Sequence, residues 1–249
     1  HHVHGTLQMV EFFGAALLAE EMEQLAGALI DGRVTNQGEA LGTDAPLRIG
    51  LPGAAENIGY RLAFMASLAA VGTLGASALA TQAYVLQISY LALMSGLAIG
   101  LAMEIAMGHV AGARRLHHAD RLLRDGLKLA LVLSVIATTV SALLSPFSLR
   151  LFTDDPGAIS LGITLLWLTV LLEPGRTFNL VVINALRAAG DARFPVMAGI
   201  ASMIVILAGG SWLFAVHLGW GLIGIWIAYI ADEWCRGLLM WARWRSRAW

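Results

Sequence analysis

The sequence predicts an all-α, polytopic membrane protein whose transmembrane helices form one lobe. Of its 249 residues, 58% are hydrophobic and 13% are charged, whereas about 25% of the residues of a soluble domain are charged. From residue 50 onward, long apolar stretches alternate with short polar connections. A membrane-spanning helix needs about 20 mostly apolar residues, and most of these stretches reach that length.

The apolar stretches predict six spans. Pro52 and Pro195 lie near the starts of two of them, where a helix tolerates the missing N–H of proline. The spans are expected over residues 52–73, 77–107, 127–148, 158–184, 194–217 and 220–242.

Residues 1–48 differ from the rest of the chain. Leu7 to Ile30 mixes apolar and acidic residues, which predicts an amphipathic helix too charged to span a membrane. Asp31 to Pro46 is rich in Gly, Asn and Asp, which is typical of a flexible linker. We therefore expect an N-terminal extension over 1–48 and a six-helix lobe over 49–249.

Basic residues predict the orientation of the spans. Of the 16 Lys and Arg residues, 12 lie in alternate connections or near the two ends of the chain, and the opposite connections carry only Arg150. Because cytoplasmic loops are enriched in Lys and Arg, this pattern predicts a multi-pass protein with both termini in the cytoplasm.

Charged side chains inside three of the apolar stretches are the main functional signal. An ionisable residue within a membrane span is costly and by default marks a transport or proton pathway. Two interpretations stay open: a static ion-pair network that joins spans one, four and six, or a carboxylate, Glu173 or Asp232, that takes up a proton or cation. The residues are Arg61 in the first span, Glu173 and Arg176 in the fourth, and Asp232, Glu233 and Arg236 in the sixth.

Two further groups of residues are candidates. Glu56, Asn57 and Tyr60 lie about one turn apart in the first span, where Glu56 either lines a cavity mouth or sits at the membrane interface. Small residues let helix backbones approach closely, so a row of glycines in the second span, with Glu104 in its gap, predicts a helix-packing face. The glycines are Gly96, Gly100, Gly108 and Gly112.

Other classes of function lack support in the sequence. The stretch from Arg114 to Arg124 is basic and amphipathic, which fits attraction to an anionic membrane leaflet better than binding of nucleic acid. The chain contains no H-E-x-x-H, G-x-S-x-G or P-loop motif, so an enzyme, a metal site and a cofactor are not expected. The histidines of the opening HHVH are more typical of a tag or a solvated end than of a metal site.

Several blocks together resemble the C-terminal half of a MATE (multidrug and toxic compound extrusion) transporter. Their order and spacing match throughout residues 49–249. They read IGLPGAAENIGY, LGASALATQAYVLQI, GLAMEIAMGHVAGARRLHHA, LRLFTDDP and NALRAAGDARFP.

The resemblance implies a secondary antiporter of the bacterial inner membrane. Such a protein exports organic cations or related amphiphiles in exchange for H⁺ or Na⁺, needs no cofactor and holds its small-molecule substrate between two six-helix lobes. This chain contains one lobe, so the resemblance implies a second lobe, either a missing N-terminal half or another copy in a homodimer, besides membrane lipids as partners. The alternative is a non-transporting membrane scaffold or a relative of lipid-linked-oligosaccharide flippases.

The chain departs from the family pattern at its cation site. In another branch of the family, coupling in this lobe uses a glutamate in the first helix and an aspartate in the fourth. The spacing of the motifs places Tyr60 and Arg176 at those positions, and neither side chain can do the same work. Glu173 and Glu56 are the nearest carboxylates, so the resemblance leaves the coupling residue open.

Overall fold

The computed structural model describes residues 44–112, 116–191 and 193–247. Those residues form helices and short connections without a β-strand, which confirms the predicted all-α class. The chain divides into two units, His1–Leu51 and Pro52–Trp249. Most of the first unit, including the predicted amphipathic helix and residues 31–43 of the predicted linker, lies outside the described residues.

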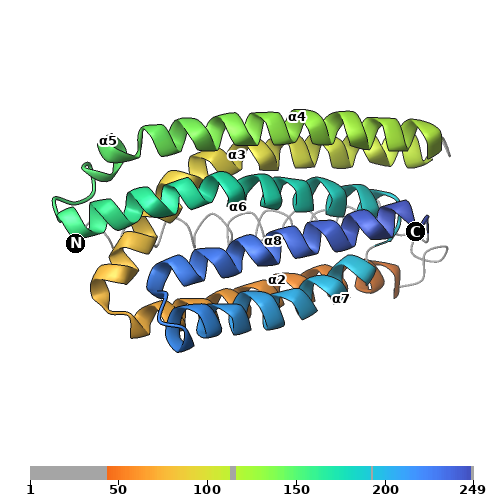
Figure 1. Cartoon of the computed structure of the whole chain (residues 1–249). Coiled ribbons are helices and arrows are strands. Elements are labelled where there is room, and N and C mark those ends of the chain that lie inside the picture. The colour runs from red at the N-terminus through yellow and green to blue at the C-terminus, as the bar shows by residue number, and fades with distance from the viewer. Residues whose placement is uncertain (1–43, 113–115, 192, 248–249) are drawn as a thin grey trace, which may run out of the picture. The chain divides into compact units, whose positions relative to one another are not determined.

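From Pro52 onward, the second unit is a bundle of long helices (Figure 1), and only the first residues of α2 belong to the first unit. The first helix, α2, begins at Asp44, so the end of the predicted linker is helical instead. The helices are α2 (Asp44–Thr73), α3 (Ala76–Gly112), α4 (Leu116–Leu143), α5 (Ser145–Leu149), α6 (Pro156–Ala188), α7 (Arg193–Ser202) and α8 (Gly221–Arg245), with π-helical segments η1 (Met203–Gly209) and η2 (Trp212–His217) between α7 and α8.

Four helices in the described part of the chain are long and apolar enough to cross a membrane. They cover Ala76–Val110, His118–Leu143, Pro156–Ala188 and Arg193–His217, the last of which comprises α7, η1 and η2. The apolar part of α2, Ile58–Thr73, is shorter. The 25 residues of α8 are long enough by geometry, but charged residues interrupt their middle. The count of six spans therefore stays a prediction.

Helix α6 is the centre of the packing. It contacts α3, α4 and α8, while α8 also contacts α7, η1 and η2. Pro174 lies inside α6, which continues as one helix to Ala188. Helix α2 reaches the same assembly through Trp212, whose Nε1 donates to the backbone oxygen of Ala66 at 3.1 Å.

Glycines allow two close approaches between helices. A Cβ added to Gly224 of α8 would lie 2.7 Å from the backbone carbonyl carbon of Phe214 in η2. A Cβ added to Gly175 of α6 would lie 2.6 Å from Nε1 of Trp234, which donates to the backbone oxygen of Leu171 at 2.9 Å. Both contacts need the missing side chain of glycine, because atoms this close would clash.

The apolar core consists of two clusters. The first surrounds Leu165, Leu172 and Trp226, and the second surrounds Phe178, Leu186 and Met240. On α6 the first cluster ends at Leu172 and the second begins at Phe178, and on α8 the corresponding residues are Tyr229 and Met240. Five charged residues fall in the interval between the clusters, which places them inside the bundle: Glu173 and Arg176 of α6, and Asp232, Glu233 and Arg236 of α8.

Candidate functional site

The candidate site is a set of charged side chains between α6 and α8. Glu173 and Arg176 are three residues apart on α6, and residues at this spacing share one face of a helix. Asp232, Glu233 and Arg236 lie within two turns on the facing side of α8. Glu173, Asp232, Glu233 and Arg236 are each at most 5% exposed, so the site is enclosed by protein.

Arg176 joins the two helices. Its Nη1 lies 2.7 Å from Oε1 of Glu173 on its own helix. Its Nε donates to Oε1 of Glu233 on α8 at 3.2 Å. The guanidinium therefore bridges two carboxylates, and it is the most exposed charged group of the site.

Arg236 continues the chain of ion pairs along α8. Its Nη2 lies 2.8 Å from Oδ2 of Asp232 and 2.9 Å from Oε1 of Glu233. Oε1 of Glu233 thus faces both arginines. We call Glu173, Arg176, Asp232, Glu233 and Arg236, together with the two polar residues described next, the charge network.

Two neutral side chains complete the charge network. Asn179 of α6 donates from Nδ2 to Oε2 of Glu233 at 3.0 Å. Ser202, at the end of α7, donates to Oδ1 of Asp232 at 2.6 Å. The network therefore ties α6, α7 and α8 together, and Glu233 has partners on both of its carboxylate oxygens.

Its charges do not balance. Three carboxylates face two guanidiniums, and Glu173 is repelled by Glu233. Oε2 of Glu173 and Oδ1 of Asn179 have no hydrogen-bond partner among the residues described. A buried charge is strongly destabilising when its partners are too few, so Glu173 is the carboxylate that is least compensated.

The expectation that Arg61 joins this network is wrong. Arg61 is exposed and forms no ion pair with a described residue, whereas Ala63 and Ser67 form the buried side of α2. Two residues along a helix correspond to roughly 200° of rotation, so the side chain of Arg61 leaves the helix away from that buried side. The position of Arg61 along the predicted span did not reveal the direction in which its side chain points.

The other candidates on α2 have different outcomes. Tyr60 is 39% exposed and interacts electrostatically with Arg176 and Glu233, so it borders the charge network. The side chains of Glu56 and Asn57 lie outside the described residues. Their predicted place at a cavity mouth or at the membrane interface stays a prediction.

The glycine row of α3 packs in part. Cβ atoms added to Gly96 and Gly100 would lie 2.6 Å from Oγ1 of Thr177 and 3.3 Å from Nδ2 of Asn184, both on α6. Gly108 has open space around it, so its predicted packing role is wrong. Each step of four residues turns about 40° beyond a full turn, and twelve residues after Gly96 the row has left the interface. The surroundings of Gly112 lie outside the described residues.

Asn179 and Ser202 were missed by the sequence reasoning. Asn179 carries a usable signal, because it lies three residues after Arg176 on the same face of α6. Ser202 carries none, since a lone hydroxyl in an apolar stretch is more often bonded to its own helix. Its role becomes visible only once α7 and α8 lie side by side.

A second, uncharged polar cluster lies one turn from the charge network. Tyr229 precedes Glu233 by four residues, and its Oη lies 3.0 Å from Oγ of Ser67 on α2. Oγ of Ser67 is in turn 2.9 Å from Oγ of Ser211, between η1 and η2. Gln82 of α3 donates to Tyr229 Oη at 3.5 Å, which is at the limit of a hydrogen bond. These bonds fix α2 against α8 without charge.

A surface pocket lies apart from the charge network. It has a volume of about 530 Å³ and is lined by Arg150, Asp154, Pro156 and Ser160 among others. Its lining is at the start of α6, more than two turns from Glu173 along that helix. Among the residues described, no group of three or more His, Cys, Asp or Glu is arranged to hold a metal ion.

Similarity to known proteins identifies the family. The sequence model of the MatE family matches residues 52–213. The chain is 41% identical over 203 residues to the "Uncharacterized transporter YisQ" of Bacillus subtilis, a match that covers 82% of this chain and 45% of YisQ. It is 27% identical over 205 residues to the "Probable multidrug resistance protein NorM" of Caulobacter vibrioides, covering 81% of this chain and 43% of that protein.

A solved structure has the same fold. It is a transporter of the MOP superfamily from Pyrococcus furiosus, with a TM-score of 0.65 and 23% sequence identity, covering 78% of this chain and 43% of that one. The binding pocket of that transporter is described as having reverse polarity, which suggests a different function for it. The chain spans about half the length of the curated relatives it matches.

The predicted resemblance to the MATE family is therefore confirmed. The match to the family model and the identity to YisQ both extend over most of the helical unit. The chain belongs to the MatE family of membrane transporters.

Proposed function

We propose that this chain is the C-terminal six-helix lobe of an antiporter that exports organic cations or other amphiphiles in exchange for H⁺ or Na⁺. Relatives named "multidrug resistance protein NorM" support the class of substrate. The matched share, 45% of YisQ and 43% of the NorM protein of Caulobacter vibrioides, supports the idea of one lobe. On this proposal the second lobe is either the N-terminal half of a longer protein or another copy of the chain.

The observation that carries the proposal is the unequal charge of the network. Three buried carboxylates share two guanidiniums, so the site has one negative charge too many when every group is ionised. A proton or a monovalent cation would neutralise that charge. A site with this surplus favours cations over anions, which argues against the basic cavity expected of a flippase for lipid-linked oligosaccharides.

Glu173 is the carboxylate best placed to take up the ion. Glu233 is held by Arg176, Arg236 and Asn179, and Asp232 by Arg236 and Ser202. Glu173 has one ion-pair partner, Arg176, and its second oxygen has none in the described part of the chain. Neutralising Glu173 would also free Arg176 to pair with Glu233 alone, which links ion uptake to the contact between α6 and α8.

Replacement of Glu173 by glutamine tests this role. Glutamine keeps the size of the side chain and removes the charge, as permanent protonation would. We expect Glu173→Gln to fold with normal yield but to abolish ion-driven efflux of a cationic dye from proteoliposomes that hold the chain with a complementary lobe. Glu104→Gln, a half-buried carboxylate of α3 outside the network, is the control and should retain efflux.

A measurement on the chain alone distinguishes H⁺ from Na⁺. If Glu173 takes up the coupling ion, the melting temperature of the detergent-solubilised parent depends on pH or on Na⁺ relative to K⁺, and Glu173→Gln loses that dependence. An ion dependence that persists in Glu173→Gln would assign uptake to another residue, with Asp232 next. A Glu173→Gln protein that no longer folds would favour the static ion-pair network.

The second lobe and the membrane placement are part of the same proposal. The basic connections favour cytoplasmic termini in a bacterial inner membrane. Efflux of a cationic dye by vesicles that contain only monomers of this chain would overturn the need for a second lobe. Labelling of single cysteines at residues 150 and 247 from either side of the membrane would test the orientation.

A further inference from the structure

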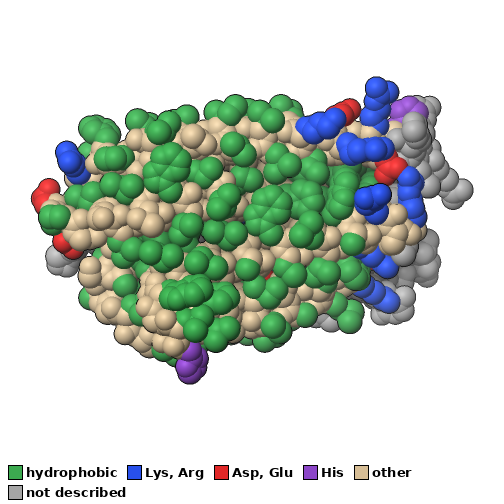
Figure 2. All heavy atoms as spheres, viewed as in Figure 1, with side chains coloured by type: hydrophobic (Ala, Val, Ile, Leu, Met, Phe, Trp, Pro, Cys, Tyr) green, Lys and Arg blue, Asp and Glu red, His purple; other side chains and the backbone are tan. Residues whose placement is uncertain are grey.

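One end of the second unit carries a concentration of basic side chains (Figure 2). It consists of the start of α4, the ends of α6 and α8 and the start of α7. Ion pairs between Arg243 and Asp191 and between Arg247 and Asp120 show that these helix ends are adjacent. We call it the basic end; its described Lys and Arg residues are Arg121, Arg124, Lys128, Arg187, Arg193, Arg243, Arg245 and Arg247.

Helix α4 presents a continuous exposed face from Arg121 to Leu143. Ala119, Leu123, Leu127 and Ala130 form its buried face against α3 and α6. The exposed side chains change character along the helix, from cationic in the first turns to apolar in the rest. We call these residues the α4 outer face: Arg121, Arg124 and Lys128, followed by Val132, Val135, Ile136, Val140 and Leu143.

We propose that the α4 outer face binds an anionic phospholipid, with its phosphate at Arg121, Arg124 and Lys128 and its acyl chains along the apolar residues. The three cations span seven residues, or about 10 Å of helix, which is close to the depth of one headgroup region, about 5–8 Å. An anionic phospholipid complements this face, because its negative headgroup is followed by apolar acyl chains as the cations of α4 are followed by apolar side chains. The proposal does not depend on the transported substrate or on the coupling ion.

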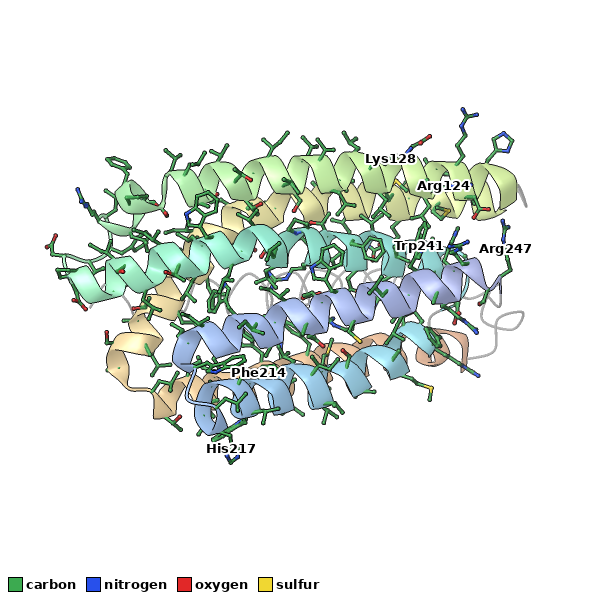
Figure 3. All side chains as sticks on the ribbon, in the orientation of Figure 1. Arg124, Lys128, Phe214, His217, Trp241 and Arg247 are labelled. Atoms are coloured by element: carbon green, nitrogen blue, oxygen red, sulfur yellow. The ribbon has the colours of Figure 1, made fainter. Side chains whose placement is uncertain are left out.

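Arg124 is held in a position suited to a phosphate. Its Nε donates to the backbone oxygen of Asp120 at 3.2 Å. Its terminal nitrogens have no partner among the described residues, and both Arg124 and Lys128, labelled on α4 in Figure 3, are exposed. Guanidinium groups bind phosphate oxygens through parallel N–H donors, so the fixed Nε leaves the binding edge available.

The nearby carboxylates do not neutralise the cations. Asp120 accepts from Nε1 of Trp244 at 2.9 Å and pairs with Arg247, so both of its oxygens are engaged. Asp125 lies 4.0 Å from Lys128, and both side chains are mostly exposed, which makes their pairing weak. The start of α4 therefore keeps a net positive charge for a ligand.

Native mass spectrometry of the detergent-solubilised chain tests the proposal. Each basic residue near a surface contributes about 1 kcal/mol to binding of anionic lipid, so Arg124→Gln combined with Lys128→Gln should weaken phosphatidylglycerol binding by roughly tenfold or more. Phosphatidylcholine with the same acyl chains should bind equally to the parent and the variant. The preference of the parent for phosphatidylglycerol should also decrease as salt screens the charges.

A variant with the same net charge provides the control. Arg193→Gln combined with Arg245→Gln removes two exposed cations from the basic end but leaves the α4 outer face intact. It should retain phosphatidylglycerol binding. Equal losses in both double variants would show a diffuse attraction and overturn the site, as would unchanged binding in the α4 variant. Competition by millimolar glycerol phosphate would assign the site to a free phosphate instead of a lipid. If the α4 variant is not monodisperse, Arg121→Gln alone replaces it.

Discussion

The charge network and the basic end use the same pairs of side chains in opposite settings. Inside the bundle, Glu233 is shared by two arginines and each carboxylate is almost fully buried. At the basic end, Arg243 pairs with Asp191 and Lys128 pairs with Asp125. Each side chain has one ion-pair partner, and these pairs are more exposed than those of the charge network. From this difference we expect the burial of an ion pair and the number of partners it shares, more than the chemistry of the pair, to decide the effect of one substitution.

Loss of Glu233 should have the largest effect. Glu233→Ala removes the carboxylate that Arg176 and Arg236 share and the acceptor of Asn179, and breaking a buried ion pair costs about 3–5 kcal/mol. We expect a large fall in melting temperature and in the monodisperse fraction on size exclusion. Asp125→Ala, at the basic end, is the control and should behave like the parent. A Glu233→Ala protein as stable as this control would show that the network contributes little to folding.

Loss of Ser202 should have an intermediate effect. Ser202→Ala removes a hydrogen bond to a carboxylate, and such bonds contribute about 1.5–3 kcal/mol. Ser211→Ala removes bonds to neutral partners and should cost about 1 kcal/mol. Thermal unfolding of both variants in one detergent compares the charged setting with the neutral one. A larger loss for Ser211→Ala would contradict the importance given to Asp232.

Loss of Arg243 should have a small, salt-dependent effect. Arg243 pairs with Asp191 at 2.7 Å and lies over the ring of Phe194, and a partly exposed pair of this kind contributes about 1 kcal/mol or less. We expect the difference in melting temperature between Arg243→Ala and the parent to shrink in about 1 M KCl because salt screens exposed charges. The deficit of Glu233→Ala should persist in that salt. If salt reduces the melting-temperature deficits of Arg243→Ala and Glu233→Ala equally, burial is not what distinguishes the charge network from the basic end.

Loss of Lys128 should leave stability unchanged. Its 4.0 Å contact with Asp125 joins two mostly exposed side chains, and many such pairs contribute nothing measurable. The melting temperature of Lys128→Ala in lipid-free detergent should equal that of the parent within error. A clear loss would reveal a structural role for Lys128 and would complicate its use as a test of lipid binding.

Much of the fold and part of the site could be predicted from the sequence. Apolar stretches located the long helices, and charges inside two of them located Glu173, Arg176, Asp232, Glu233 and Arg236. The predictions for Arg61 and Gly108 were wrong for the same reason. Each considered the distance along a helix without the accumulated rotation around its axis. In the structure, Ala63 and Ser67 are buried, and the rotation between Ala63 and Arg61 places Arg61 on the other side of α2. Ser202 and the π-helical segments depend on how helices pack, so no local pattern predicts them.

The contact between Gly224 and the backbone of Phe214 limits how this part of the protein can move. With no side chain between them, α8 and η2 cannot slide past each other without a collision of main-chain atoms. The bond from Ser202 to Asp232 fastens α8 to the same long segment at a second point. A conformational cycle would therefore carry the last two long segments together as one hairpin.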